Sequence, residues 1–147
     1  MAAEGWDVTC VDIVKKAVRS AERRAETAGV DARFVVGDVT AVDQLGLGRA
    51  FDLLIDFSCF HELSDEQRLA AGHAASAVAA DAATLLIQVF APGRRNPMLP
   101  RGASREDIEL SFTGSTIIDK TAADVSGAPS AVQKAQPCFY RLQRVST

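Results

Sequence analysis

The stretch that decides the fold is Trp6-Asp7-Val8-Thr9-Cys10-Val11-Asp12, a short β-branched and apolar segment that ends in an acid. A long amphipathic pattern follows directly, so this order predicts a strand, a carboxylate and then a helix. In a doubly wound α/β sheet, ligands bind outside the carboxyl ends of the strands. A carboxylate there can accept hydrogen bonds from the vicinal hydroxyls of a ribose. Asp12 is therefore a candidate nucleoside contact; the alternative is that it only caps the following helix.

The next segments repeat the same order. Small apolar residues at spacings of three and four predict a helix over about 13–28, and Gly29 is placed to end it. A second strand over 32–36 ends in Gly37-Asp38. Because a helix connects the two strands, we expect them to be parallel.

The rest of the chain continues as an α/β protein. The expected elements are strands at 51–56, 84–90, 115–119 and 138–145, helices at 64–80 and 105–112, a loop at 91–101 and a loop or loose hairpin at 121–137. Ser64 and Gln67 form a capping-box pattern at the start of the first of these helices. Residues 84–90 are nearly all apolar, which is typical of a parallel strand buried on both faces.

Composition narrows the possible functions. The chain has 147 residues, 48% of them hydrophobic and 24% charged, as expected for one globular domain. A net charge of −3 gives no sign of nucleic-acid binding, and no apolar run reaches the roughly 18 residues that a membrane span needs. The N-terminus does not have the pattern of a signal peptide. Cys10, Cys59 and Cys138 are scattered, so we expect no disulfide framework, no metal site and a cytoplasmic protein with reduced thiols.

Three predicted strands end in acids, namely Asp12, Asp38 and Asp56. The carboxyl ends of parallel strands meet at one edge of a sheet, so we expect these side chains to gather there. A strand that ends in Gly-Asp suits a nucleobase pocket, because glycine permits close approach and the carboxylate can accept a hydrogen bond from an exocyclic amine. Ile13 and Val39 are apolar neighbours that could enclose a flat ring.

The sequence resembles the class I S-adenosylmethionine-dependent methyltransferases. The matching stretches are 5–12, 35–38, 51–56 and the strand at 85–90 followed by Pro92-Gly93. The resemblance implies a Rossmann-like, doubly wound, mostly parallel sheet with an antiparallel C-terminal strand. Within the family, the sequence looks most like small-molecule methyltransferases of the thiopurine-methyltransferase or tellurite-resistance type.

The resemblance also implies roles for individual residues. Asp12 would hold the ribose hydroxyls of S-adenosylmethionine, and Ile13 would pack on one face of its adenine. Asp38 would accept a hydrogen bond from the adenine amino group, and Val39 would offer its backbone nearby. These are the positions that match the family's cofactor-binding pattern.

Further residues near the presumed site concern the acceptor. Asp56 and Phe57 would face the methionine part of the cofactor or a small-molecule acceptor. His61 follows the third strand and is a candidate general base, although a local hydrogen bond in the loop would also explain it. Cys59 could meet an acceptor or be a small buried hydrophobe. The loop arginines, Arg94, Arg95 and Arg101, could orient an anionic acceptor or be solvated. Trp6 is interpreted as a partly buried aromatic residue at the start of the strand, and His73 as a structural or exposed residue of the helix.

The sequence departs from the family pattern at its start. The first strand and the glycine-rich loop that normally precede residue 5 are absent, so residues 1–147 predict a single, N-terminally truncated domain. We expect either that the true start lies upstream of Met1, the interpretation that we favour, or that the chain is a remnant. The absent strand lies mid-sheet in the family, so its loss exposes two apolar strand edges. Those edges could pair directly, pair with another chain as in a homodimer, or promote aggregation.

Three functions follow from these observations. The leading one is methyl transfer from S-adenosylmethionine to a small molecule, with the activity of this chain in doubt. A nicotinamide-dependent oxidoreductase fragment would use Asp12 equally well, but it explains Gly37-Asp38 and the C-terminal strands less well. A non-catalytic remnant that dimerises or binds a partner through its strand edges is the third. The acceptor itself cannot be read from these residues.

Overall fold

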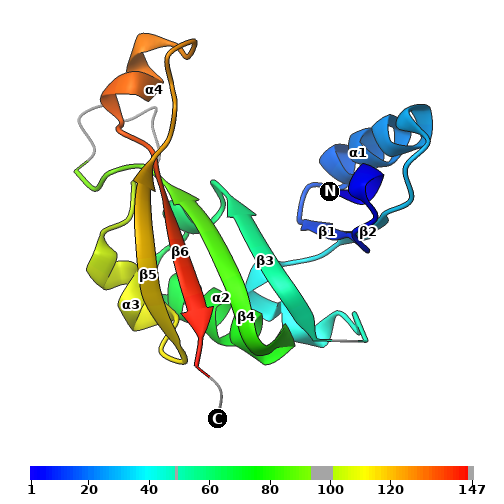
Figure 1. Ribbon diagram of the computed structural model, residues 1–147, viewed down its shortest axis with the longest axis horizontal. Helices are drawn as coiled ribbons and strands as arrows, with labels where there is room; N and C mark the ends of the chain where they lie inside the picture. The colour runs from blue at the N-terminus through cyan, green and yellow to red at the C-terminus, as the bar shows by residue number, and fades with distance from the viewer. Residues whose placement is uncertain (49, 94–100, 146–147) are drawn as a thin grey trace.

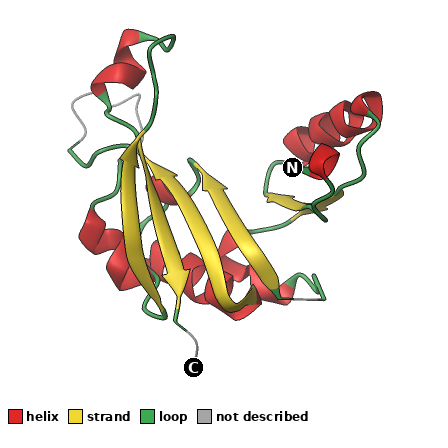
Figure 2. Ribbon diagram, in the orientation of Figure 1, coloured by secondary structure: helices red, strands yellow, loops and turns green. Residues whose placement is uncertain are grey.

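The computed structural model describes residues 1–48, 50–93 and 101–145. Its elements alternate between strands and helices along most of the chain (Figures 1 and 2). With η denoting 3-10 helices, they are η1 (Ala2–Glu4), β1 (Thr9–Asp12), α1 (Lys15–Ala28), β2 (Arg33–Val36), η2 (Val39–Gln44), β3 (Phe51–Phe57), η3 (Phe60–Glu62), α2 (Asp65–Val78), β4 (Ala79–Val89), α3 (Arg105–Ser111), β5 (Ser115–Ala122), α4 (Ser130–Lys134) and β6 (Cys138–Arg144).

The N-terminal unit consists of β1, α1 and β2. The two strands are parallel, with Thr9 opposite Arg33 and Asp12 opposite Val36, as the helical connection predicted. Gly29 ends α1 in the left-handed conformation, with φ of 65°, a geometry that glycine adopts without steric cost. This unit has little interior of its own. Within residues 1–46, all of which the structure describes, Val18 alone is buried.

The main sheet has four strands in the order β3-β4-β6-β5. β3 and β4 are parallel, whereas β6 is antiparallel to both β4 and β5. Helices α2 and α3 cover one face of this sheet (Figure 1). The predicted α/β fold with an antiparallel C-terminal strand is confirmed.

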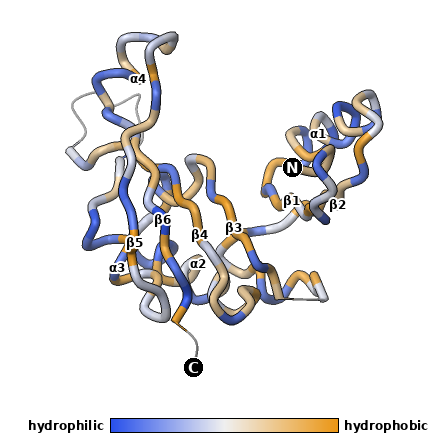
Figure 3. Tube along the Cα trace, viewed as in Figure 1, coloured by the Kyte–Doolittle hydropathy of each residue, from blue (hydrophilic) through white to orange (hydrophobic). Residues whose placement is uncertain are grey.

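The hydrophobic core lies between the main sheet and its two helices. The strands β4 and β6 supply its centre, and Figure 3 shows apolar residues along β3 and β4. The buried cluster consists of Phe60, Leu85, Ile87, Val89, Ala103, Ile108, Phe112, Cys138, Tyr140 and Leu142. Along β4, Leu85, Ile87 and Val89 are buried while the residues between them are half-buried, so burial on both faces, expected from the apolar run, is complete on one face only.

The two sheets do not join. β1 pairs with β2 and β3 pairs with β4, but β1 and β3 form no ladder with each other. Figure 1 shows the N-terminal unit set apart from the main sheet, with the segment that contains η2 as the connection. Direct pairing of the two exposed edges, one of three expected outcomes, is therefore not what the structure shows.

Several element boundaries differ from those expected. β4 begins at Ala79, directly after α2, because Ala79 already pairs with Phe51. β5 extends to Ala122 because the ladder with β6 continues to Cys138, and an exposed edge strand tolerates its polar residues. The segment expected to be a loop also contains the short helix α4. In the described ranges, no helix is long and apolar enough to cross a membrane.

Candidate functional site

Asp12 lies at the carboxyl end of β1 and is exposed to solvent. Its Oδ1 atom accepts a hydrogen bond from the Val14 backbone N–H at 2.7 Å, which directs the chain into α1. Its Oδ2 atom receives no hydrogen bond from the residues that the structure describes. Asp12 therefore does cap the helix, and it still presents an oxygen that could accept from a ligand.

Asp38 repeats this arrangement at the end of β2. Its Oδ1 atom accepts from the Thr40 backbone N–H at 2.9 Å and from the Thr40 hydroxyl at 2.8 Å. These two hydrogen bonds favour the ionised form and lower the pKa of the Asp38 carboxyl. Its Oδ2 atom also receives no hydrogen bond from the described part of the chain.

Gly37 has a packing role at this position. A Cβ atom there would lie 2.5 Å from a methyl group of Leu45, too close to be accommodated without movement. The sequence analysis related this glycine to the approach of a ligand. In the structure, its missing side chain makes room for Leu45.

Asp56, at the end of β3, lies in a more enclosed position than Asp12 or Asp38. Its Oδ1 atom accepts from the Cys59 N–H at 2.9 Å, and its Oδ2 atom accepts from the Phe60 N–H at 3.2 Å. Burial raises the pKa of the Asp56 carboxyl, and these two backbone N–H groups oppose that rise. Asp56 thus shapes the turn that leads into η3.

The three strand-end acids act together on the Cys59 thiol. Burial, followed by the negative charges of Asp56, Asp12 and Asp38, raises the pKa of Cys59 to about 11. The thiol is therefore protonated at neutral pH and a poor nucleophile, which favours its interpretation as a small apolar residue. Asp12 and Asp38 lie at the end of the two-stranded sheet and Asp56 lies near the end of β3 in the main sheet, so the single sheet edge that the sequence predicted is divided between two sheets.

Exposed apolar side chains accompany these acids. Ile13 is the first residue after β1, and Phe57 is the last residue of β3. Each of them is 67% exposed. Phe57 contacts Phe139 edge to face, with 6.3 Å between ring centroids. Val39 is half-buried and lines a cleft beside β3. Exposed apolar side chains at these strand ends are available for contact with a ligand, although single exposed apolar residues also occur elsewhere on this chain, as at Leu110 and Val145.

His61 is buried, with 1% of the residue exposed. Its Nδ1 atom accepts a hydrogen bond from the Phe90 N–H at 3.1 Å, and its ring stacks obliquely on Phe90. Burial lowers the pKa of His61, so the imidazole is neutral near pH 7 and carries its proton on Nε2. The local hydrogen bond that the sequence left open is therefore present.

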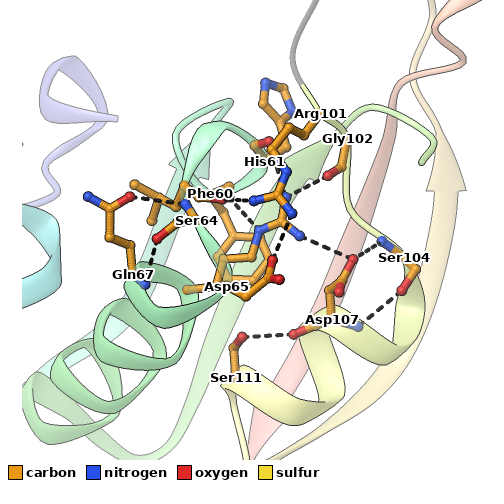
Figure 4. Close-up of polar contacts among 12 residues, drawn as sticks. Phe60, His61, Ser64, Asp65, Gln67, Arg101, Gly102, Ser104, Asp107 and Ser111 are labelled. Carbon is orange, nitrogen blue, oxygen red and sulfur yellow. Dashed lines mark hydrogen bonds and ion pairs between the residues drawn. The ribbon is translucent and has the colours of Figure 1, made fainter. Parts of the chain in front are cut away.

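Arg68 was missed by the sequence analysis and contacts four residues through its guanidinium group. Only 4% of it is exposed. Its guanidinium donates to the carbonyls of Phe60, His61 and Gly102 and forms an ion pair with Asp107, with 3.2 Å between Nη1 and Oδ2 (Figure 4). It thereby ties η3, the segment before α3 and α3 itself together.

A spacing signal for Arg68 was available. The buried residues of α2 are Arg68, Ala71, Gly72 and Ala74. The helical face defined by these small residues includes Arg68, whereas the apolar Leu69 is 45% exposed. Because arginine is charged, the sequence alone did not suggest that Arg68 would be buried.

Of the three loop arginines considered for an anionic acceptor, Arg101 lies within the described residues. Arg101 donates to the Leu63 carbonyl at 3.2 Å and forms an exposed ion pair with Asp65 at 2.8 Å. Arg94 and Arg95 lie outside the described residues. Across the described ranges, no group of three or more His, Cys, Asp or Glu side chains has the arrangement of a metal site.

Comparison with known proteins identifies the family. A protein-family model described as a methyltransferase domain matches residues 1–82, more than half of the chain. The chain therefore belongs to this family, and its fold is that of the class I S-adenosylmethionine-dependent methyltransferases. A search among curated protein sequences gave no match.

Solved structures agree on the fold. The N-methyltransferase NodS from Bradyrhizobium japonicum, in complex with S-adenosyl-L-homocysteine, is 16% identical with a TM-score of 0.73, covering 94% of this chain and 66% of its own. A TehB-like methyltransferase from Corynebacterium glutamicum is 18% identical, with a TM-score of 0.72; the match covers 97% of this chain and 71% of that protein's chain. An S-adenosylmethionine-dependent methyltransferase from Clostridium acetobutylicum is 14% identical, with a TM-score of 0.71; the match covers 96% of this chain and 76% of that protein's chain.

Proposed function

We propose that the chain binds S-adenosylmethionine across the carboxyl ends of β1, β2 and β3 and transfers its methyl group to a small-molecule acceptor. The family match supports the cofactor class. The observation that supports the location is a cleft lined jointly by residues of β1, of the segment after β2 and of β3, among them Thr9, Val39 and Asp56. The family match also favours this function over a nicotinamide-dependent oxidoreductase.

The exposed acids have the donor–acceptor chemistry that a nucleoside requires. Asp12 would accept hydrogen bonds from the ribose hydroxyls through Oδ2, while Oδ1 keeps its bond to the Val14 N–H. Asp38 would accept from the adenine amino group through its own Oδ2 atom. Ile13 would pack on the adenine ring, and Val39 would offer backbone groups beside it.

S-adenosylmethionine, when bound, supplies a methyl group attached to a positively charged sulfur. The acids at the strand ends create a negative environment that attracts such a cation. Asp56 and Phe57 would face the methionine part or the acceptor, with the exposed ring of Phe57 offering an apolar surface.

Methyl displacement depends mainly on proximity and alignment, and a base is needed only for an acceptor that must lose a proton. His61 was the candidate base, but its Nδ1 atom is already occupied by the Phe90 N–H. The proposal therefore assigns alignment to the strand-end residues and a positioning role to His61.

Calorimetric titration with S-adenosylmethionine tests the proposal, using Asp12→Asn and Asp38→Asn. An asparagine Oδ1 atom keeps the bond to Val14 or Thr40, while the amide nitrogen replaces the free Oδ2 acceptor. Each variant should therefore fold normally and bind roughly tenfold more weakly or worse. Asp31→Asn, an exposed change just before the opposite end of β2, is the matched control.

Two outcomes would overturn the proposal. The first is an absence of measurable binding by the unmodified chain. The second is binding that Asp12→Asn and Asp38→Asn affect no more than Asp31→Asn does, because the strand-end carboxylates would then not be contacts. A parallel titration with NAD addresses the oxidoreductase alternative, which binding of NAD without S-adenosylmethionine would favour.

A further inference from the structure

A short turn connects β3 to η3 at the edge of the main sheet where the proposed function places the cofactor. Its first residue, Ser58, has a φ of 68°, in the left-handed region that residues other than glycine rarely adopt. The Ser58 hydroxyl donates a hydrogen bond to Oε1 of Gln88 in β4 at 3.0 Å. A strained backbone of this kind persists only where the surrounding structure holds it in place.

An acid at the end of β3 holds the N–H side of this turn. The two carboxylate oxygens of Asp56 accept hydrogen bonds from the N–H of Cys59 at 2.9 Å and from the N–H of Phe60 at 3.2 Å. The entry into η3 is therefore bonded directly to a strand-end carboxylate.

A buried cation holds the carbonyl side of the same segment. The Arg68 guanidinium donates to the carbonyl of Phe60 at 3.3 Å and to that of His61 at 3.2 Å. It also donates to the Gly102 carbonyl at 2.6 Å and lies 3.2 Å from the Asp107 carboxylate, which balances its charge. The segment between β3 and α2 is thus bonded on one side by an anion and on the other by a cation.

This buried ion pair is better explained by the geometry that it imposes than by stability. Replacing a buried pair with apolar residues of similar volume often leaves stability unchanged or higher, so packing alone does not require the charges. The fork of an arginine holds several acceptors at a fixed spacing, which an apolar residue cannot do. Two of the acceptors that Arg68 fixes are carbonyls of η3 itself.

We propose that Arg68, with its charge balanced by Asp107, is a positioning residue for the cofactor: it holds the turn after β3 in the conformation that receives the amino-acid end of S-adenosylmethionine. This inference rests on the proposed function, in which Asp56 and Phe57 face the methionine part or the acceptor. The ammonium group of that amino-acid end is attracted by the Asp56 carboxylate. Arg68 acts through η3 and not by contact with the ligand.

Binding of two related nucleosides tests this role. S-adenosylhomocysteine carries the amino-acid end, whereas methylthioadenosine has the same nucleoside and sulfur without it. Arg68→Lys keeps a positive charge beside Asp107 but loses the forked contact with the Phe60 and His61 carbonyls. We expect calorimetry to show S-adenosylhomocysteine binding weakened roughly tenfold and methylthioadenosine binding changed by less than about twofold.

The ratio of the two dissociation constants separates positioning from stability. Partial unfolding of a variant lowers the apparent affinity for both compounds by the same factor, so it leaves this ratio unchanged. Arg105→Lys is the matched control, because Arg105 forms an exposed ion pair with Glu109. It should leave both affinities as they are in the unmodified chain.

Hydrogen exchange gives a second measurement that needs no ligand. The amides of Cys59 and Phe60 should exchange roughly tenfold faster in Arg68→Lys, because the turn that they belong to is held less firmly. The amide of Ile87, in the buried strand β4, should keep its rate and serves as the internal reference.

Several results would overturn the inference while leaving the proposed function intact. They are an unchanged ratio of dissociation constants in Arg68→Lys, unchanged exchange at Cys59 and Phe60, or equal affinity of the unmodified chain for both compounds. The last result would show that the turn does not receive the amino-acid end. Failure of the unmodified chain to bind either compound would contradict the proposed function itself, and this inference with it.

Discussion

A single residue, His61, should make the stability of the protein depend on pH. Burial lowers its pKa in the folded chain below the ordinary value of 6.5, so the unfolded chain binds a proton more readily. The contribution of neutral His61 to the free energy of unfolding should be fully present above pH 6.5. It should be lost progressively as the pH drops from 6.5 through the pKa of His61 in the folded chain. His61→Asn keeps an acceptor for the Phe90 N–H and should flatten this dependence.

Urea unfolding at pH 5 and pH 7.5 measures the effect. The exposed His73→Asn variant is the control and should keep the pH dependence of the unmodified protein. Retention of the full dependence by His61→Asn would show that other groups cause it.

Arg68 should be among the most costly residues to truncate. Arg68→Ala removes donors from three carbonyls and leaves Asp107 without its ion-pair partner, which should lower the free energy of unfolding by about 3 kcal/mol. Arg105→Ala breaks an exposed pair with Glu109 and should cost less than about 1 kcal/mol. Chemical denaturation of both variants measures the difference, and similar losses would contradict the assigned role.

Single residues were predictable where local chemistry fixes them. Asp12, Asp38 and Asp56 stand at strand ends as predicted, because the strand pattern locates them without knowledge of long-range contacts. Arg68 and the environment of His61 could not be derived in this way. Their partners are Gly102, Asp107 and Phe90, which lie far along the chain.

Among the contacts between secondary-structure elements, Gly72 determines how closely α2 and α3 approach each other. A Cβ atom at this position would lie 2.0 Å from the Ser111 carbonyl oxygen, which belongs to the backbone of α3. Gly72→Ala should therefore destabilise the protein by about 2 kcal/mol, although alanine favours an isolated helix by about 1 kcal/mol. Thermal or urea unfolding measures this, with the exposed His73→Ala as a neighbouring control. A stabilised Gly72→Ala variant would refute the close contact.

Elements were predictable to the extent that their ends carry local signals. The Ser64 and Gln67 capping box begins α2 as expected, with both of its hydrogen bonds present. The ends of β4 and β5 depend instead on pairing with Phe51 and with β6, and sequence patterns do not reveal such register. Tertiary pairing therefore extended strands into segments that looked like helix or loop.

Whole-molecule organisation was only partly accessible to the sequence. The order of strands and helices predicted the α/β class, and the departure from the family pattern predicted two exposed strand edges. The structure shows what the pattern could not, namely that the edges stay apart and line a common cleft. This outcome depends on how η2 packs between two units, which is a property of the assembled chain.

The two units should differ in stability, because they differ in how much they bury. The core cluster lies entirely within residues 60–142, whereas Val18 is the buried residue of the first 46. Amides of β1 and β2 should therefore exchange about a hundredfold or more faster than those of β4 and β6, corresponding to roughly 3 kcal/mol less opening free energy. Hydrogen exchange followed by mass spectrometry measures this. Equal exchange in the two units would contradict this prediction, because it would show that they open together.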